Sequence, residues 1–334
     1  MRPRRRSTAW HQPRAGRQPR GGRGGLPASG LIARLTSTPA IIAALWTIWS
    51  SSFLAIKLGL TYSSPEVFTV LRVVAATTVL LIVVATRRRS HGGFLGGRGV
   101  HRYGVALGAT NVTAFMALQN AGLVHAPIGI ASVLIYTQPL LVALGAALLL
   151  RERLTLRQVL GLVTGWLGVV LLVFGELELG LTPIGSVLLL LASAVAWAAG
   201  TLFVKWLPAE VSVWSLLLWQ NLYGLLPVSL LAALGTSTAT WGVPLFFAMA
   251  WAGALAGIGG FGLLFVLLRR GKAGVVTSWI FAVPIIASAL GVIVLGETLH
   301  PGLFFGGGAV AVGIYLVNSR GRRSGSVDGQ STPV

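Results

Sequence analysis

Cysteine is absent from the 334-residue sequence, and acidic residues are scarce, with seven Asp and Glu against 26 Lys and Arg. The lack of cysteine excludes a disulfide framework and thiol chemistry. Only 10% of the residues are charged, whereas an ordinary soluble domain has about 25%. The chain has no nucleophile–base motif, no phosphate-binding Gly-Lys-Ser/Thr loop and no metal-ligand cluster among its five His. These absences argue against an enzyme, and we expect neither a cofactor nor a metal site.

Apolar residues dominate the composition. Hydrophobic residues make up 54% of the chain, in runs that could each cross a hydrocarbon core about 30 Å thick. Because lipid offers backbone groups no partners, such runs must be helices. The sequence therefore predicts an all-α polytopic protein of the lipid bilayer, with ten transmembrane segments at 40–60, 66–86, 103–122, 127–150, 156–174, 183–204, 212–232, 243–268, 273–296 and 301–318.

The positions of the basic residues orient these segments. If the N-terminus is cytoplasmic, 24 of the 26 Lys and Arg lie on the cytoplasmic side, and the exceptions are Lys57 and Arg72. This is the positive-inside pattern of the plasma (inner) membrane, so we expect both termini in the cytoplasm. The pattern also accounts for the net charge of +19 without nucleic acid as a partner. Residues 1–38 and 319–334 are expected to be disordered cytoplasmic tails.

One stretch of sequence occurs twice. Pro139 is followed thirteen positions later by Glu152, and Pro284 is followed thirteen positions later by Glu297, with mostly apolar residues between. The chain thus reads as two units, 39–178 and 179–318, each with five helices. Because five is odd, the second unit enters the membrane from the opposite side. Inverted repeats of this kind place a substrate site near the bilayer midplane, between the halves.

The chain resembles the drug/metabolite transporter superfamily, in its EamA-type ten-helix group. The resemblance lies in the Trp46 to Lys57 stretch of the first helix, the Pro65 to Arg72 stretch of the second, and the paired proline-to-glutamate segments with the glycine-rich helices after them. It spans about residues 40–318. It implies a transporter of small organic molecules, often an exporter, whose first four helices in each half surround a central cavity. Amino acids, other metabolites and drugs all fall within the superfamily's range.

Deep aromatic and polar residues in matched helices are the candidates for substrate binding. Trp49 corresponds to Trp197, Arg72 falls opposite Gln220, and Trp279 lies deep in the ninth segment. An ionisable group inside a membrane is costly, which makes Arg72 a functional hypothesis by default. We expect the ligand to have an apolar body and an anionic group for Arg72. The alternatives are a structural ion pair for Arg72 and plain helix packing for each Trp.

A proline inside a membrane helix marks two further places. Pro139 frees a backbone carbonyl one turn earlier and can kink the helix, and freed backbone is tolerated where it lines a cavity. Gln138 directly precedes it and joins the candidate binding residues, although most such amides bond helix to helix. We expect Pro284 to act in the same way as Pro139 in the ninth segment.

Charges at the helix ends suggest gates. Lys57 and Glu297 both fall at the outer face, one from each half, and their counterparts Lys205 and Glu152 both fall at the inner face. We therefore expect Lys57–Glu297 and Lys205–Glu152 pairs to form alternately as outer and inner gates. Alternatively, Lys57 extends its ammonium to the outer headgroups, and neighbouring charges neutralise Lys205 and Glu152.

The function that fits these features is transport, by alternating access, of a small organic metabolite such as an amino acid or a related amphipathic compound, with export as the expected direction. The near absence of carboxylates and His within the segments argues against a deep proton relay. A passive channel, and a membrane enzyme or sensor that does not transport, are the alternatives.

Overall fold

Helices make up the described part of the molecule. The structure, a computed structural model, describes residues 38–87, 98–149, 151–178, 180, 182–204, 211–263, 282–298 and 300–318. In these ranges the sole β-structure is an isolated antiparallel bridge between Ser63 and Ala239. The first half contains α2 (Thr38–Tyr62), α3 (Pro65–Arg87), α4 (Arg98–Leu107), the π-helix η1 (Gly108–Ala114), α5 (Phe115–Leu123), α6 (Ile128–Ile135), α7 (Gln138–Leu149) and α8 (Leu156–Glu178). The second contains α9 (Ile184–Val204), α10 (Val213–Leu234), α11 (Val243–Met249), the π-helix η2 (Ala250–Gly260), α14 (Ala282–Leu295) and α15 (Pro301–Asn318).

Eight helical stretches among the described residues are long and apolar enough to cross a membrane. They coincide with eight of the ten predicted segments. The third predicted segment is the continuous helical run α4–η1–α5, which is less apolar because it carries Asn111, Gln119 and Asn120. The ninth is described only from Ala282, as the shorter apolar helix α14. The described part of the chain is therefore helical and apolar enough for a membrane protein, and ten crossings stay a prediction.

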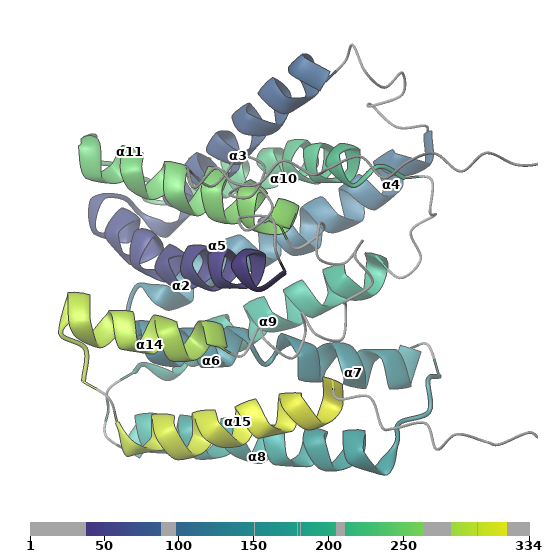
Figure 1. The fold of residues 1–334 in the computed structure, drawn as a ribbon. Helices are drawn as coiled ribbons and strands as arrows, with labels where there is room; N and C mark the ends of the chain where they lie inside the picture. The colour runs from purple at the N-terminus through teal and green to yellow at the C-terminus, as the bar shows by residue number, and fades with distance from the viewer. Residues whose placement is uncertain are drawn as a thin grey trace, which may run out of the picture. The chain divides into compact units, whose positions relative to one another are not determined.

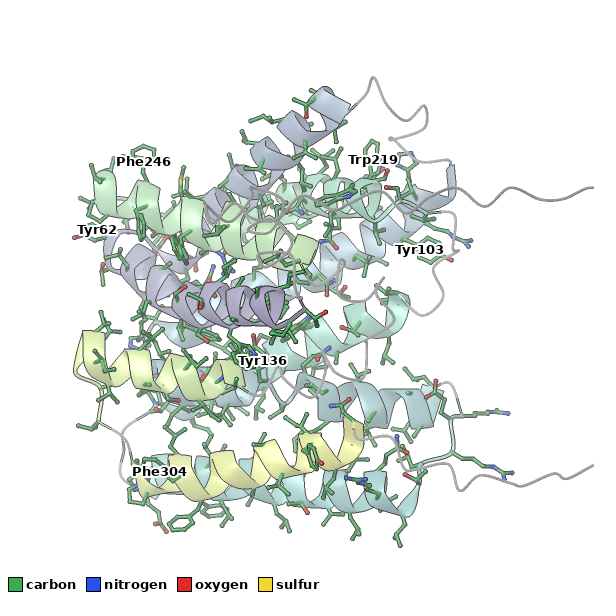
Figure 2. The ribbon with its side chains drawn as sticks, viewed as in Figure 1. Tyr62, Tyr103, Tyr136, Trp219, Phe246 and Phe304 are labelled. Atoms are coloured by element: carbon green, nitrogen blue, oxygen red, sulfur yellow. The ribbon has the colours of Figure 1, made fainter. Side chains whose placement is uncertain are left out.

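Large apolar side chains point away from the helix contacts. On α8 the side chains of Leu167 and Phe174 are 58% and 62% exposed, and on α15 that of Phe304 is 62% exposed. Figure 2 shows Phe304 and Phe246 at the periphery, whereas Tyr136 lies among the helices. Exposed apolar surface of this extent is costly in water but favourable against lipid tails.

Glycines bring α8 and α15 into backbone contact, and Figure 1 shows the two helices side by side. A Cβ added at Gly161 would collide with the backbone of Gly313, and one added at Gly168 would collide with that of Gly306. Lipid tails are as apolar as the helices, so the hydrophobic effect does not drive membrane helices together. They associate instead by close packing, which small residues allow.

Helices of the two halves also pack on one another elsewhere. The first helix of the first half, α2, contacts α11, η2 and α14, and the first helix of the second half, α9, contacts η1, α5, α6 and α7. On the predicted outer side, the loop after α2 meets the loop before α11 at the Ser63–Ala239 bridge, where the Ser64 N–H donates to the Thr238 carbonyl at 2.9 Å.

The segment that contains Pro139 is interrupted. α6 ends at Ile135 and α7 begins at Gln138, so that Tyr136 and Thr137 lie at a break, with Pro139 in the first turn of α7. Proline has no N–H to donate and favours the first turn of a helix. Pro284 lies in the first described turn of α14, and the residues before Ala282 are outside the described ranges.

The two proline-to-glutamate segments end in the same kind of turn. Arg151 and Gly296 adopt a left-handed backbone, with φ of 54° and 68°. The next residue, Glu152 or Glu297, donates its N–H to a carbonyl six residues earlier, at Ala146 or Gly291. A left-handed conformation suits glycine and costs another residue about 1–2 kcal/mol.

Because one turn has glycine and the other arginine at the left-handed position, substitutions at the two positions are expected to change the stability in opposite directions. Gly296→Ala is expected to lower the free energy of unfolding by about 1 kcal/mol, and Arg151→Gly to raise it by a similar or smaller amount, because glycine also has more entropy to lose. The apparent midpoint of thermal unfolding in detergent measures both. Gly180→Ala is the matched comparison, since Gly180 also has a positive φ of 61° and an added Cβ has no atom within 4 Å at either glycine, so backbone strain alone is expected to lower its midpoint too. Equal midpoints for Gly296→Ala and the parent protein would contradict the strain argument.

Candidate functional site

A small cavity lies between helices of the two halves. It has a volume of ≈ 70 Å³ and is lined by residues from α2, α3, α5, α6, α9 and η2 together with the adjoining Tyr136 and Phe261. This volume holds a few waters, whereas ordinary ligand sites occupy about 300–1,000 Å³. A metabolite can therefore enter only if the surrounding helices move apart. The lining residues are Trp49, Ser52, Phe53, Arg72, Phe115, Met116, Gln119, Ile135, Tyr136, Trp197, Ala252, Ala256, Gly257 and Phe261.

Among the described residues of this lining Arg72 is the one cation, and its side chain is only 6% exposed. Its Nη1 donates to Gln119 Oε1 at 3.1 Å and to Asn120 Oδ1 at 2.7 Å, both from α5. Its Nε is buried and has no hydrogen-bond partner. Among the described residues no carboxylate pairs with this guanidinium. The site thus holds a buried positive charge whose Nη1 is bonded to two amide oxygens and whose Nε has no partner.

A chain of hydrogen bonds fixes the amide that faces Arg72. The Thr69 hydroxyl donates to the Pro65 carbonyl at 2.7 Å, and so must accept the bond at 2.8 Å from Asn120 Nδ2. The amide nitrogen of Asn120 is therefore directed at Thr69 and its oxygen at Arg72. These hydrogen bonds hold the guanidinium of Arg72 in place without a ligand.

The π-helix η2 packs closely on the other side of the cavity. A Cβ added at Gly253 would overlap the backbone of Arg72, and one added at Gly260 would overlap the indole of Trp49. Trp49 Nε1 donates to the Ala256 carbonyl of η2 at 3.2 Å. π-Helical turns within membrane or soluble helices occur often at functional sites. Here the wide turn and its glycines seat α2 and α3 against the second half.

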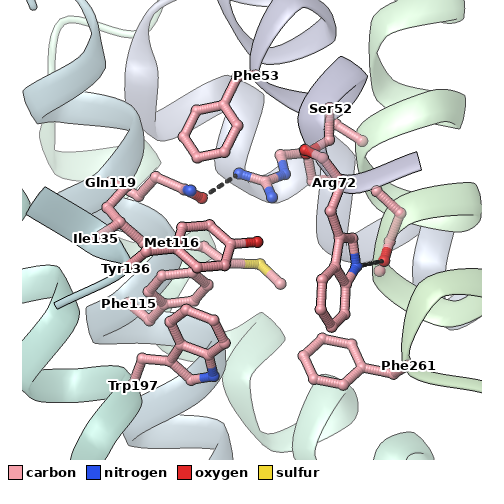
Figure 3. A pocket seen from close by; sticks show the side chains of 14 residues that line it. Ser52, Phe53, Arg72, Phe115, Met116, Gln119, Ile135, Tyr136, Trp197 and Phe261 are labelled. Carbon is pink, nitrogen blue, oxygen red and sulfur yellow. Dashed lines mark hydrogen bonds between the residues drawn. The ribbon is translucent and has the colours of Figure 1, made fainter. Parts of the chain in front are cut away.

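Aromatic rings form most of the remaining wall. Trp197 lies edge-on to Tyr136, with ring centroids 5.7 Å apart, and is tilted against Phe115 at 5.4 Å. Figure 3 shows Arg72 on one side of the pocket and Phe115, Trp197 and Phe261 on the opposite side, with the Tyr136 hydroxyl pointing into the space between. The cavity is therefore amphipathic, with a cationic side and an aromatic side.

Three of the predicted binding residues come together in this cavity: Trp49, Arg72 and Trp197. Gln138 and Gln220 are buried but do not line it. Gln138 Nε2 donates to the Thr201 hydroxyl at 2.8 Å, which is the helix-to-helix bond expected of a membrane amide. Gln220 lies in α10, which packs against α3, α4 and η1. The predicted residue Trp279 lies outside the described residues.

The sequence did not single out several residues of the lining. Tyr136 is the most important, and a signal for it existed, because it lies in the break that Pro139 predicts. Gln119 and Asn120 were visible as polar residues in an apolar helix, but nothing in the sequence assigned them to Arg72. Phe115, Met116 and Phe261 look like ordinary core residues until the fold places them.

The predicted outer gate residues meet at one turn. Lys57 Nζ donates to the Val124 carbonyl, at the end of α5, at 3.2 Å. Both carboxylate oxygens of Glu297 accept from the Ile128 N–H, at the start of α6, at 2.9 Å. Gly291 leaves the space into which this carboxylate folds. Lys57 and Glu297 thus bind opposite ends of the same turn rather than each other, and the charge of Glu297 acts on the Lys57 ammonium through space.

The geometry of Glu297 is electrostatically favourable, because a helix N-terminus carries unpaired N–H groups and a partial positive charge. Glu297 belongs to the second half and α6 to the first, so this cap joins the halves. Glu152 lies in the equivalent turn at the end of α7, and its predicted partner Lys205 lies outside the described residues.

A larger cavity of ≈ 480 Å³ lies between α6, α14 and α15. Its lining is apolar except for Ser288 and Tyr136, and it contains no charged side chain. It offers no charged group to an ionic metabolite, so we place the candidate site in the smaller cavity. Tyr136 lines both cavities.

Comparisons with known proteins show what the chain is similar to. The profile of the EamA-like transporter family matches residues 38–174 and, a second time, residues 184–319. The chain is 28% identical over 289 residues to "Uncharacterized transporter YvbV" of Bacillus subtilis, covering 86% of this chain and 93% of that protein. It is 26% identical over 294 residues to "Probable amino-acid metabolite efflux pump" of Salmonella typhimurium, covering 84% and 95%. A solved structure titled "Crystal structure of protein" has the same fold, with a TM-score of 0.57, 19% identity, and coverage of 83% of this chain and 94% of that one.

Proposed function

This chain belongs to the EamA-like transporter family, and on that basis we propose that it exports a small amphipathic organic metabolite, such as an amino acid or a related compound. The observation that carries the proposal is the cavity that combines buried Arg72 with aromatic rings of both halves. The printed name of the Salmonella relative, an amino-acid metabolite efflux pump, supports export and this class of substrate.

Alternating access between two inverted five-helix repeats is the proposed mechanism. Three observations support it. The family profile matches the chain twice, both proline-to-glutamate segments end in the same left-handed turn, and the glycine contacts of α8 and α15 are reciprocal. With an offset of 145 residues, Gly161 is equivalent to Gly306 and Gly168 to Gly313. Replacing each glycine of the Gly161–Gly313 contact by its equivalent in the other half therefore gives the Gly168–Gly306 contact. A two-fold axis generates this pattern.

The proposed gates close opposite ends of the cavity. At the outer end, Lys57 and Glu297 hold the turn between α5 and α6, and release of the Glu297 cap would let the halves part there. At the inner end, Lys205 and Glu152 are the equivalent residues by sequence. Single contacts of this kind are worth only about 1–3 kcal/mol. Such small energies suit a switch between two states of similar stability.

The plasma membrane, with both termini in the cytoplasm, is the proposed location, because 24 of 26 basic residues then lie inside. Reporter fusions at each terminus are expected to give a signal with a cytoplasmic reporter such as green fluorescent protein and none with alkaline phosphatase. Alkaline phosphatase activity from either fusion would contradict this topology and with it the assignment of outer and inner gates.

Flux into proteoliposomes tests the proposed function against its alternatives. A carrier is expected to show saturable uptake and exchange of labelled substrate when amphipathic metabolites are supplied, including amino acids. Linear, non-saturating flux would indicate a passive channel. Absence of flux and of binding for the whole panel would favour a membrane protein that does not transport.

A further inference from the structure

We propose that the central cavity selects a monoanion, a carboxylate with an apolar aromatic or aliphatic body and no free ammonium group. This inference rests on the proposed function and narrows its substrate class. It therefore excludes unmodified zwitterionic amino acids as the preferred ligands and favours simple carboxylic acids or amino acids whose amino group is blocked.

The first step is the unpaired charge of Arg72. Its side chain is 6% exposed, its Nε is without a partner, and its two bonds from Nη1 go to neutral amides. A buried charge is retained at low cost only when it is paired or functional. One guanidinium offers a two-pronged donor that matches one carboxylate. The charge balance of the cavity is completed by a single negative charge from the ligand.

The second step is the absence of a group for an ammonium. The lining that the structure describes contains no Asp or Glu, and the four Glu side chains placed in the structure lie elsewhere. In the sequence, every acidic residue lies at or beyond the end of a predicted transmembrane segment, so none is placed deep in the membrane. An ammonium on the α-carbon of a bound acid would therefore lie near the guanidinium, where like charges repel, with no carboxylate to offset the repulsion.

Neutral groups of the lining do not replace that carboxylate. Ser52 donates its hydroxyl to the Trp49 carbonyl, so its oxygen can accept one bond from an ammonium but brings no negative charge. Gln119 Oε1 already accepts from the Arg72 guanidinium, which would repel an ammonium placed beside it. Cation–π contact with the rings contributes about 0.5–2 kcal/mol, whereas an ammonium needs three acceptors to replace its water. Tyr136 is better suited to the anion, because its hydroxyl points into the pocket and can donate to a carboxylate oxygen.

Ligands that share one body and differ in charge test the proposal. Binding to the purified full-length protein would be measured calorimetrically and by thermal shift for 3-phenylpropanoate, N-acetyl-phenylalanine, phenylalanine, 3-phenylpropylamine and 3-phenylpropanamide. We expect the two monoanions to bind at least tenfold more tightly than phenylalanine, and the amine and amide to bind more weakly still. Tyr136→Phe, which keeps the ring and its packing, is expected to weaken the monoanions severalfold and to weaken the amide less, because a neutral amide oxygen accepts a weaker hydrogen bond than a carboxylate.

The outcomes separate this inference from the proposed function. Equal or tighter binding of phenylalanine, or equal binding of the amide, would overturn the selection of monoanions while leaving transport intact. Saturable flux of zwitterions with none of the anions would do the same. If no member binds, then phenyl carboxylates are not ligands and the inference fails, whereas the proposed function is decided separately by flux of the wider metabolite panel.

Discussion

Replacing Arg72 with Gln is expected to reduce substrate affinity at least 30-fold while leaving a folded protein. Removing one partner of a buried, hydrogen-bonded charge pair costs about 2–5 kcal/mol, and 2 kcal/mol corresponds to a factor of about 30. Gln can still bond to Gln119 and Asn120, which now bond to the guanidinium. The equivalent position of the second half carries Gln220, so the fold accommodates this residue there.

Two variants control the measurement. Arg72→Lys keeps the charge but loses the planar two-pronged donor, so it is expected to bind with intermediate affinity. Arg102→Gln removes an exposed Arg of α4 that contacts Tyr103, and is expected to bind as the parent does. Transport kinetics of Arg72→Gln that match those of the parent and of Arg102→Gln would remove Arg72 from the site.

Replacing Glu297 is expected to have the second largest effect, through the outer gate. Glu297→Leu removes both acceptors of the Ile128 N–H and leaves Lys57 without a nearby negative charge. A charge-assisted bond of this kind is worth about 1.5–3 kcal/mol, so the balance between closed and open outer gates would shift about tenfold or more. We expect the transport rate to fall by a similar factor, whereas substrate binding in detergent changes little.

The form of the gate is decided by the other substitutions. Glu297→Gln keeps one oxygen that can accept from Ile128 and is expected to retain more activity than Glu297→Leu. In the double variant Lys57→Glu with Glu297→Lys, Lys cannot accept from Ile128 and Glu cannot donate to the Val124 carbonyl, so no rescue is expected. Rescue by the double variant would show instead that Lys57 and Glu297 pair directly in another conformation. Glu178→Gln, an exposed residue at the end of α8, is the control.

Much of the architecture follows from the sequence because a lipid environment leaves few choices. Runs of apolar residues must become helices in lipid, and eight of the ten predicted segments reappear as candidate spans. The break at Tyr136 follows from Pro139, which cannot supply a backbone donor. The third segment shows the limit of hydropathy, because its polar residues serve contacts inside the protein and lower its apolar character.

The site was only partly predictable, because it depends on partners from distant parts of the chain. Repeat matching and depth led to Trp49, Arg72 and Trp197, which the fold brings to one cavity. The position before Pro139 gave Gln138, whose amide bonds to Thr201 instead, because sequence position does not show which face of a helix meets a neighbour. The pairing of Glu297 with a backbone N–H was also beyond the sequence, because backbone partners leave no residue pattern.

The central claim is that substrate binds between the halves with its anion on Arg72 and its body among the aromatic rings. The most direct test is a structure with bound 3-(4-bromophenyl)propanoate, in which anomalous scattering locates the bromine. We predict a carboxylate within about 3 Å of the Arg72 guanidinium, with the bromine near Phe115, Trp197 and Phe261. A bromine in the apolar cavity between α14 and α15, with the carboxylate away from Arg72, would contradict the claim.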